Sequence, residues 1–392
     1  MLDLRQLRDQ LSDFEEYQAD QQDRRGAQRD RADALLEVCH EHWQAVQDAV
    51  ATAQPRRLVA QMREPPAATH VAPERPSPIT VTATDGSQIY PDRHVEPPFF
   101  LLNVGRVAFQ YGTTEEPHLD STPTLHFREP LAARFNAPLD TIPTELVSAL
   151  RDERELSQLL DVATTARVSG RPLVALADGT LIRWMIRGMD DERLEDELIS
   201  RYTEHLEEFR DDGLALASYV SRPASTEVVN LLRFVGGDLD AMPPSMPTDA
   251  PDMPRLDGLL DRHVLDTVLA PGERSAVFGS ASHIQGEYPT GTDIAFFYLK
   301  GPGPGGGELG RVEVPRWVAD DPALLDRVHA TVLQECRKGK GYPLALSEAH
   351  ERAVVRASER EAFFRLVERR LRDAGLTPTG SRKRRSKQRP RV

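Results

Sequence analysis

The sequence predicts an α/β fold in which a mixed β-sheet is flanked by helices. Apolar runs typical of strands alternate with segments whose apolar residues recur at helical spacing. Within the main part of the chain, several strand-like segments precede the first helix-like one. This order favours a sheet that combines a meander of neighbouring strands with strands connected through helices.

The bulk composition is that of a folded protein without membrane spans. The chain has 392 residues, 39% of them hydrophobic, which suffices for one large core or two modest ones. No run approaches the roughly 18 consecutive apolar residues of a membrane span, and acids stand where a signal peptide would have its apolar core. Only two cysteines occur, so neither a disulfide framework nor a Cys-rich zinc site is expected. We therefore expect a cytoplasmic location.

Charge is distributed unevenly along the chain. The formal net charge of −13 argues against a generally basic surface that coats nucleic acid. By contrast, the last stretch, SRKRRSKQRPRV, contains seven basic residues and no acid. We predict a disordered basic tail over residues 376–392, which either contacts a phosphate backbone or an acidic partner, or only increases solubility.

The chain is predicted to contain four parts in order. Residues 1–62 are rich in Gln, Glu, Arg and Ala and predict a helical arm, either a hairpin or coiled-coil-like. A Pro-rich linker follows over residues 63–78. The main domain spans residues 79–375, with a Pro- and Met-rich loop insertion near residues 238–256, and the basic tail follows it.

Strand and helix patterns follow one another through the main domain. TVTATDGSQIYPDRH alternates like a strand that ends on Asp-Gly-Ser, and PPFFLLNVGRVAFQYG predicts two further strands split near Asn103. TIPTELVSALRDERELSQLLDVATTA predicts a helix. RPLVALADGTLIRW then predicts a buried strand that also ends on Asp-Gly.

Two aspartates follow strand-like runs in the same way. Asp85 and Asp178 each precede a glycine and a hydroxyl residue. Asp-Gly is an ordinary turn sequence, so a structural role is one interpretation. The other is a metal site, because Mg²⁺ and Mn²⁺ take oxygen ligands and carboxylates also compensate their charge.

A third acid is expected on the helix between these strands, where Glu153 and Glu155 are the candidates. On a helical wheel Glu153 falls within the apolar face and Glu155 points away. An acid in a core-facing stripe is costly unless it is paired or binds a metal. This favours Glu153 as a ligand, with Glu155 as the alternative and a buried ion pair as the competing interpretation.

Three further residues could serve such a site. His350, on a predicted helix, could bind a metal or transfer protons, although a structural role is the simpler interpretation. Tyr342 lies in the loop before that helix. Arg311, on the strand RVEVPRW, could bind a phosphate oxygen or pair with Glu313 on the same strand face.

The order of the motifs resembles the NurA nuclease family. The motifs are DGSQIYPDRH, LADGTLIRW, GLALASYVSRPASTEVVNLL, FFYLKG, RVEVPRWV and GYPLALSEAHERAVV, and they cover about residues 79–372. The resemblance implies an RNase H-like core and a Mn²⁺-dependent 5′-to-3′ exonuclease with single-strand endonuclease activity. It also implies a ring-shaped homodimer that acts on DNA with a HerA-like hexameric ATPase in DNA end resection for recombinational repair.

The resemblance assigns roles to residues of this chain. It implies that Asp85, Asp178 and a helix acid, Glu153 or Glu155, hold Mn²⁺ or Mg²⁺ ions, with His350 as ligand or proton shuttle. Residues that position the carboxylate and the scissile phosphate would be Ser87, Arg311 and Tyr342. The second motif has Thr180 in place of serine, which keeps the hydroxyl. The alternatives are a non-catalytic RNase H-like scaffold that binds DNA or an ATPase, and a metal phosphodiesterase that acts on RNA.

Overall fold

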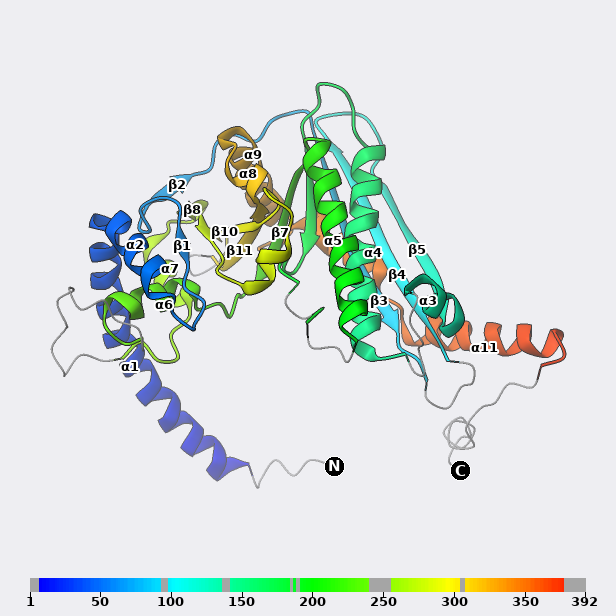
Figure 1. Cartoon of the computed structure of the whole chain (residues 1–392), viewed down its shortest axis with the longest axis horizontal. Coiled ribbons are helices and arrows are strands. Elements are labelled where there is room, and N and C mark those ends of the chain that lie inside the picture. The colour runs from blue at the N-terminus through cyan, green and yellow to red at the C-terminus, as the bar shows by residue number, and fades with distance from the viewer. Residues whose placement is uncertain are drawn as a thin grey trace. The chain divides into compact units, whose positions relative to one another are not determined.

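The chain divides into two compact units, each built from several segments. The computed structural model describes residues 7–92, 98–135, 142–183, 186–187, 191–239, 255–303 and 307–376 (Figure 1). The first unit comprises residues 1–72, 220–285 and 294–313, and the second comprises residues 73–219, 286–293 and 314–392. Among the described helices, none is both long and apolar enough to cross a membrane.

The first unit combines the N-terminal helices with short strands and two later helices. Its elements are α1 (Arg8–Glu41), α2 (Trp43–Ala53), β1 (Gln61–Met62), β2 (Thr69–Val71), α6 (Glu227–Val235), α7 (Asp261–Val268), β8 (Glu273–Ser275), β9 (Phe278–Gly279), β10 (Ile294–Lys300) and most of β11 (Leu309–Pro315). The 3₁₀-helix η2 (His283–Glu287) is divided between the units. Its residues up to 285 are assigned to the first unit, and those from 286 are assigned to the second.

The second half of α1 belongs to the hydrophobic core of the first unit. Its residues Ala32, Leu35, Leu36 and Cys39 are buried in one cluster with side chains of α6 and α7. The predicted arm, residues 1–62, is therefore helical over most of its length, and part of it joins a core instead of standing apart. Its polar composition concealed this because only one stripe of the helix is buried.

The second unit is built on a mixed sheet. Its elements are β3 (Ile79–Ile89), β4 (Phe99–Tyr111), β5 (His118–Phe127), α3 (Arg128–Phe135), α4 (Thr144–Thr165), β6 (Leu173–Asp178), α5 (Glu192–Asp211), most of β7 (Ala215–Ser221), α8 (Arg316–Ala319), α9 (Pro322–Lys338), α10 (Leu344–Ala353) and α11 (Ala357–Asp373). The strand order is β7–β6–β3–β4–β5.

Strand direction changes at β3, the central strand of that sheet. On one side, β4 and β5 continue as an antiparallel meander. On the other side, β6 and β7 run parallel to β3. Parallel neighbours need a crossover, and α4 and α5 lie in the chain before β6 and before β7 respectively. This arrangement confirms the predicted RNase H-like core with a mixed sheet flanked by helices.

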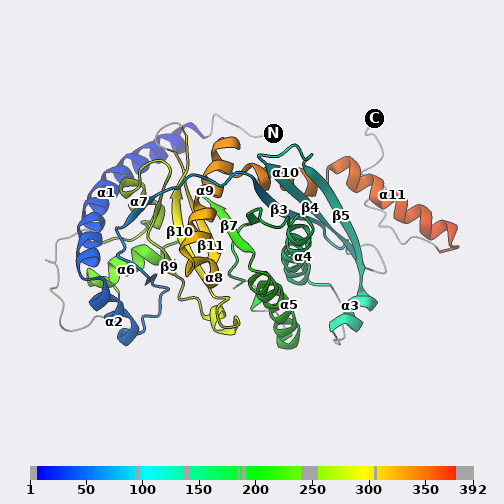
Figure 2. The same cartoon turned by 90° about the horizontal axis from the view of Figure 1, so that it is seen from above.

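Helices cover both faces of the sheet in the second unit. The helices α4 and α5 lie side by side on one face, and α10 packs against β3 and β4 on the other (Figure 2). Gly105 lies opposite Asp85 in the β3–β4 pair, so both residues face α10. A Cβ atom at Gly105 would lie 2.1 Å from the carbonyl oxygen of Ala349, so the α10 backbone packs directly on this glycine.

The predicted break near Asn103 is wrong, because β4 runs without interruption from Phe99 to Tyr111. Asn103 nonetheless has a specific partner, since its side-chain amide donates a hydrogen bond to the carbonyl oxygen of Ala353 at 2.8 Å. The last carbonyl groups of a helix lack intrahelical partners. A polar residue in mid-strand thus anchors the end of α10, and its polarity does not mark a turn.

Several predicted segments lie wholly or partly outside the described residues. Of the loop insertion predicted near residues 238–256, residues 240–254 are not described. The same holds for residues 377–392 of the predicted basic tail, 376–392. The linker predicted at 63–78 contains the short strand β2. Both cysteines, Cys39 and Cys336, are buried and free.

The contact between α10 and β4 gives a stability prediction. We expect Gly105→Ala to lower the free energy of unfolding by about 1–3 kcal/mol, because the new methyl group meets helix backbone that can move only as a unit. Chemical denaturation of both proteins measures the difference.

The control is Gly286→Ala, at a glycine with no heavy atom within 4 Å of the added Cβ. We expect this variant to unfold like the wild type. Equal stability of Gly105→Ala and the wild type would contradict the close approach of α10.

Candidate active site

Asp85 and Asp178 lie next to each other on two parallel strands. The residues before them, Thr84 and Ala177, are paired in the β3–β6 ladder. Their side chains therefore emerge at the same edge of this pair of strands, as the sequence predicts. The strand interpretation needs one correction, because β3 does not end at the Asp-Gly-Ser sequence. Pairing with β6 stops at Thr84, whereas pairing with β4 continues to Ile89.

Both aspartates are held from α10 and the loop before it. The hydroxyl of Tyr342 donates a hydrogen bond to Oδ1 of Asp178 at 2.6 Å. Nδ1 of His350 lies 2.6 Å from Oδ2 of Asp85, while the His350 side chain is 63% exposed. The remaining oxygen of Asp85 accepts a hydrogen bond from the backbone N–H of Gly86. Four of the predicted site residues therefore meet on one face of the sheet.

The helix glutamates are placed the opposite way from the sequence-based preference. Glu153 points toward α5 and α3, where Oε1 lies 3.2 Å from Nε2 of His205 and Oε2 lies 3.4 Å from Arg134. Although burial raises the pKa of Glu153, these two partners lower it below its usual value. The structure thus does not bring Glu153 to the aspartates and gives it the buried ion pair considered as the alternative.

Glu155 is the helix acid beside the aspartates. It reaches the sheet over Gly86, where an added Cβ would lie 2.3 Å from its Oε1 atom. The wheel argument missed this because it assumed one apolar face, whereas α4 packs against both the sheet and α5. Gly86 has no side chain and therefore allows this close approach.

Charge accumulates where these carboxylates meet. Burial, followed by the nearby charges of Asp152 and Asp85, raises the pKa of Glu155 to about 8. Burial and the charge of Asp85 also raise the pKa of Asp178, against the hydrogen bond from Tyr342. A raised carboxyl pKa means that the site disfavours its own negative charge in the absence of a further cation.

Two predicted residues have structural partners. The hydroxyl of Ser87 donates a hydrogen bond to the carbonyl oxygen of Ala353, so it anchors the end of α10 together with Asn103. Arg311 belongs to the first unit, where it is 4% exposed and forms ion pairs of 2.8 Å with Glu227 and Glu313. Arg311 therefore stabilises the packing of the first unit.

The sequence analysis missed a network of polar residues around Glu155. Arg151 pairs with Glu155, with 3.0 Å between Nε and Oε1, and also with Asp152. Asp152 in turn accepts a hydrogen bond from Arg183 at 3.1 Å. The helical spacing of Arg151 and Glu155, four residues apart, was the available signal for the first of these pairs.

The donor set fits a divalent cation. No three His, Cys, Asp or Glu side chains in the described part of the chain are arranged as metal ligands. The three acids are engaged by Tyr342, His350 and Arg151. Their carboxylate oxygen atoms are nevertheless the donors that Mg²⁺ and Mn²⁺ prefer.

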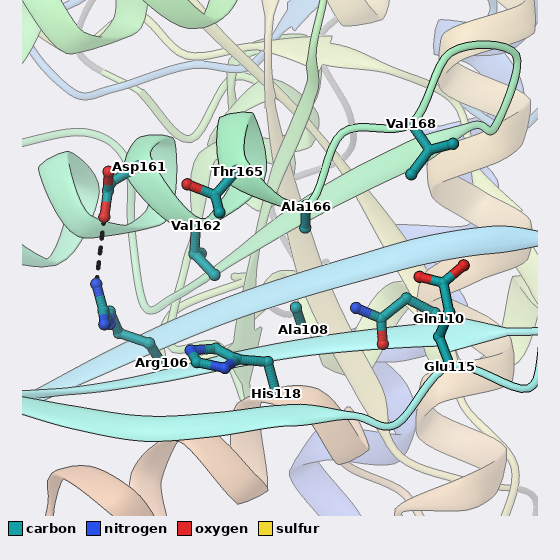
Figure 3. A pocket seen from close by; sticks show the side chains of 10 residues that line it. All are labelled: Arg106, Ala108, Gln110, Glu115, His118, Asp161, Val162, Thr165, Ala166 and Val168. Atoms are coloured by element: carbon teal, nitrogen blue, oxygen red, sulfur yellow. Dashed lines mark hydrogen bonds and ion pairs between the residues drawn. The ribbon is translucent and has the colours of Figure 1, made fainter.

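A separate cavity lies elsewhere on the second unit. It has a volume of about 490 Å³ and is lined by residues of β4, β5 and the end of α4, among them Arg106, His118 and Asp161 (Figure 3). Arg106 pairs there with Asp161 at 3.2 Å. None of the predicted site residues lines this cavity.

The comparisons with known proteins identify one family. The NurA domain family matches residues 79–355 of the chain. The structure resembles the NurA nuclease from Sulfolobus solfataricus, with 17% sequence identity, a TM-score of 0.49, and coverage of 78% of this chain and 88% of that one. It also resembles a NurA structure with manganese, with 12% identity, a TM-score of 0.36, and coverage of 77% and 91%.

A type 1 RNase H with a type 2 active-site motif is a further structural match, with 11% identity, a TM-score of 0.22, and coverage of 41% of this chain and 71% of that one. No curated protein matches the chain. The match of the family to residues 79–355 covers well over half of the sequence and the whole carboxylate group. The chain therefore belongs to the NurA nuclease family.

Proposed function

We propose that the chain is a metal-dependent DNA nuclease whose ligands are Asp85, Glu155 and Asp178. The observation that supports this most is that Asp85 and Asp178 lie side by side on β3 and β6, with Glu155 of α4 next to them over Gly86, in a chain of the NurA family. The charge of Asp85 contributes to the raised pKa values of both Glu155 and Asp178, which supports a shared site. Glu155 replaces Glu153 in the ligand set for the geometric reason given above.

A divalent cation, Mn²⁺ or Mg²⁺, bound by these carboxylates would activate water and stabilise the departing oxygen of a phosphodiester. Residues of the chain have supporting tasks. Tyr342 orients Asp178 through its 2.6 Å hydrogen bond. His350 is exposed and adjacent to Asp85, so it can accept or deliver a proton at the site, or serve as a further ligand.

We further propose the biological setting that the family resemblance implies. The protein would act as a homodimer with 5′-to-3′ exonuclease and single-strand endonuclease activity, together with a HerA-like hexameric ATPase in DNA end resection in the cytoplasm. The net charge of −13 is compatible with such a partnership, because an ATPase could supply much of the affinity for DNA. Co-purification with that ATPase, and stimulation of cleavage by it, would test the partnership.

The two helix glutamates provide a matched test of the ligand set. We expect Glu155→Gln to lower Mn²⁺-dependent cleavage of single-stranded DNA on the order of 100-fold or more, because it removes a charged ligand. We expect Glu153→Gln to retain cleavage within a few-fold while its free energy of unfolding falls by about 1–3 kcal/mol, because its ion pair is buried.

Both variants make the same chemical change two residues apart on one helix. Initial rates on end-labelled DNA and denaturation curves measure the two effects. Loss of cleavage in Glu153→Gln, with Glu155→Gln fully active, would reverse the assignment.

Gly86 provides a second test that acts through position alone. In Gly86→Ala, the new methyl group meets the carboxylate of Glu155 and Cγ of Arg151, and both are side-chain atoms that can shift. We expect cleavage to fall about 100-fold, because a displaced ligand spoils the catalytic geometry. The midpoint of thermal unfolding should change little. Wild-type cleavage by Gly86→Ala would show that Glu155 need not lie over the strand.

A further inference from the structure

Arg151 is held beside the candidate metal ligands by an ion pair with Glu155 and by hydrogen bonds to two acceptors. Its Nε lies 3.0 Å from Oε1 of Glu155. One terminal nitrogen donates to Oε1 of Gln88 at 3.1 Å, and the other donates to Asp152 at 3.0 Å. The guanidinium is thus the positive charge in direct contact with Glu155, and its side chain remains 30% exposed.

Asp152 is itself fixed from its other side. Its second carboxylate oxygen accepts a hydrogen bond from Arg183, which is mostly buried and lies over the ring of Tyr202 at 4.8 Å. Asp152 therefore bridges two arginines, and Arg151 keeps both of its hydrogen-bond acceptors, Gln88 and Asp152, if Glu155 turns to another partner. Such an anchored guanidinium would stay at the site with its ion pair to Glu155 broken and its Nε–H group without a hydrogen-bond partner.

A divalent cation and Arg151 compete for the same carboxylate. Glu155 can satisfy its charge with the guanidinium or with a metal ion, and a metal ion offers two charges shared with Asp85 and Asp178. A phosphate group brought to the site would in turn present oxygen atoms to the Nε–H group and the charge of the guanidinium. Arginine suits this exchange because its planar fork matches carboxylates and phosphates equally well.

We propose that Arg151 exchanges partners: it pairs with Glu155 in the metal-free protein and contacts a phosphate of nucleic acid once a divalent cation takes Glu155. This inference rests on the proposed nuclease function, since it assumes the same ligand set. It gives Arg151 the phosphate contact first assigned to Arg311, which is engaged within the first unit.

Metal binding tests the first half of the exchange without any cleavage. In calorimetric titrations of the full chain with Mn²⁺, Arg151→Gln should bind the ion about fivefold more tightly than the wild type, because a partly exposed ion pair no longer has to be broken. Unchanged or weaker Mn²⁺ binding by Arg151→Gln would overturn the proposal.

Binding of single-stranded DNA tests the second half. With Ca²⁺ in place of Mn²⁺, Arg151→Gln should bind DNA more weakly, and the dependence of log K on log salt should correspond to about one phosphate contact fewer. Arg151→Lys keeps the charge but lacks the planar fork of donors. Its affinity for DNA should therefore lie between those of the wild type and Arg151→Gln. DNA binding by Arg151→Gln equal to that of the wild type would also overturn the proposal.

Arg154→Gln is the matched control. Arg154 lies on the same helix, and it acts on the pKa of His126 on β5. The affinities of Arg154→Gln for Mn²⁺ and for DNA should match those of the wild type. Thermal unfolding verifies that all variants are folded. A wild-type protein that cleaves DNA with Mn²⁺ while Arg151→Gln shows neither effect would refute the exchange and leave the nuclease intact. A wild type that neither binds Mn²⁺ nor cleaves DNA would refute both.

Discussion

The second unit depends on the accommodation of several carboxylates at one place on its sheet. Two glycines in neighbouring strands make this possible, since Gly86 admits Glu155 from one face and Gly105 admits the backbone of α10 from the other. Hydrogen bonds from Ser87 and Asn103 anchor the end of α10, which carries His350 to Asp85. Burial, together with nearby carboxylate charges, raises the pKa values of Glu155 and Asp178.

The two glycines differ in what surrounds them, and this separates folding from function. Gly105 packs against helix backbone, so its environment is rigid and belongs to the fold. Gly86 packs against side-chain atoms of Glu155 and Arg151, so its environment can adjust. One strand pair therefore packs against helix backbone on one face and against a carboxylate side chain on the other.

The sequence predicted those features that depend on local pattern and motif order. The mixed sheet follows from strand and helix periodicity, and the proximity of Asp85 to Asp178 follows from two similar strand sequences. Choosing between Glu153 and Glu155 needed knowledge that α4 packs on two surfaces, which a single helical wheel cannot supply. The burial of Arg311 and the position of the Arg151 side chain depend on residues distant in sequence, such as Glu227 and Gln88. Local sequence patterns therefore do not reveal them.

The most direct test of the account is digestion of a DNA strand labelled at its 5′ or 3′ end by the purified full chain with Mn²⁺, alongside Asp85→Ala. The account predicts that the wild type releases label only when the cation is present and that Asp85→Ala releases none while it remains folded. The two labels also report the polarity of digestion. Cleavage by Asp85→Ala at the wild-type rate, or no cleavage by the wild type even with a cognate ATPase, would contradict the account.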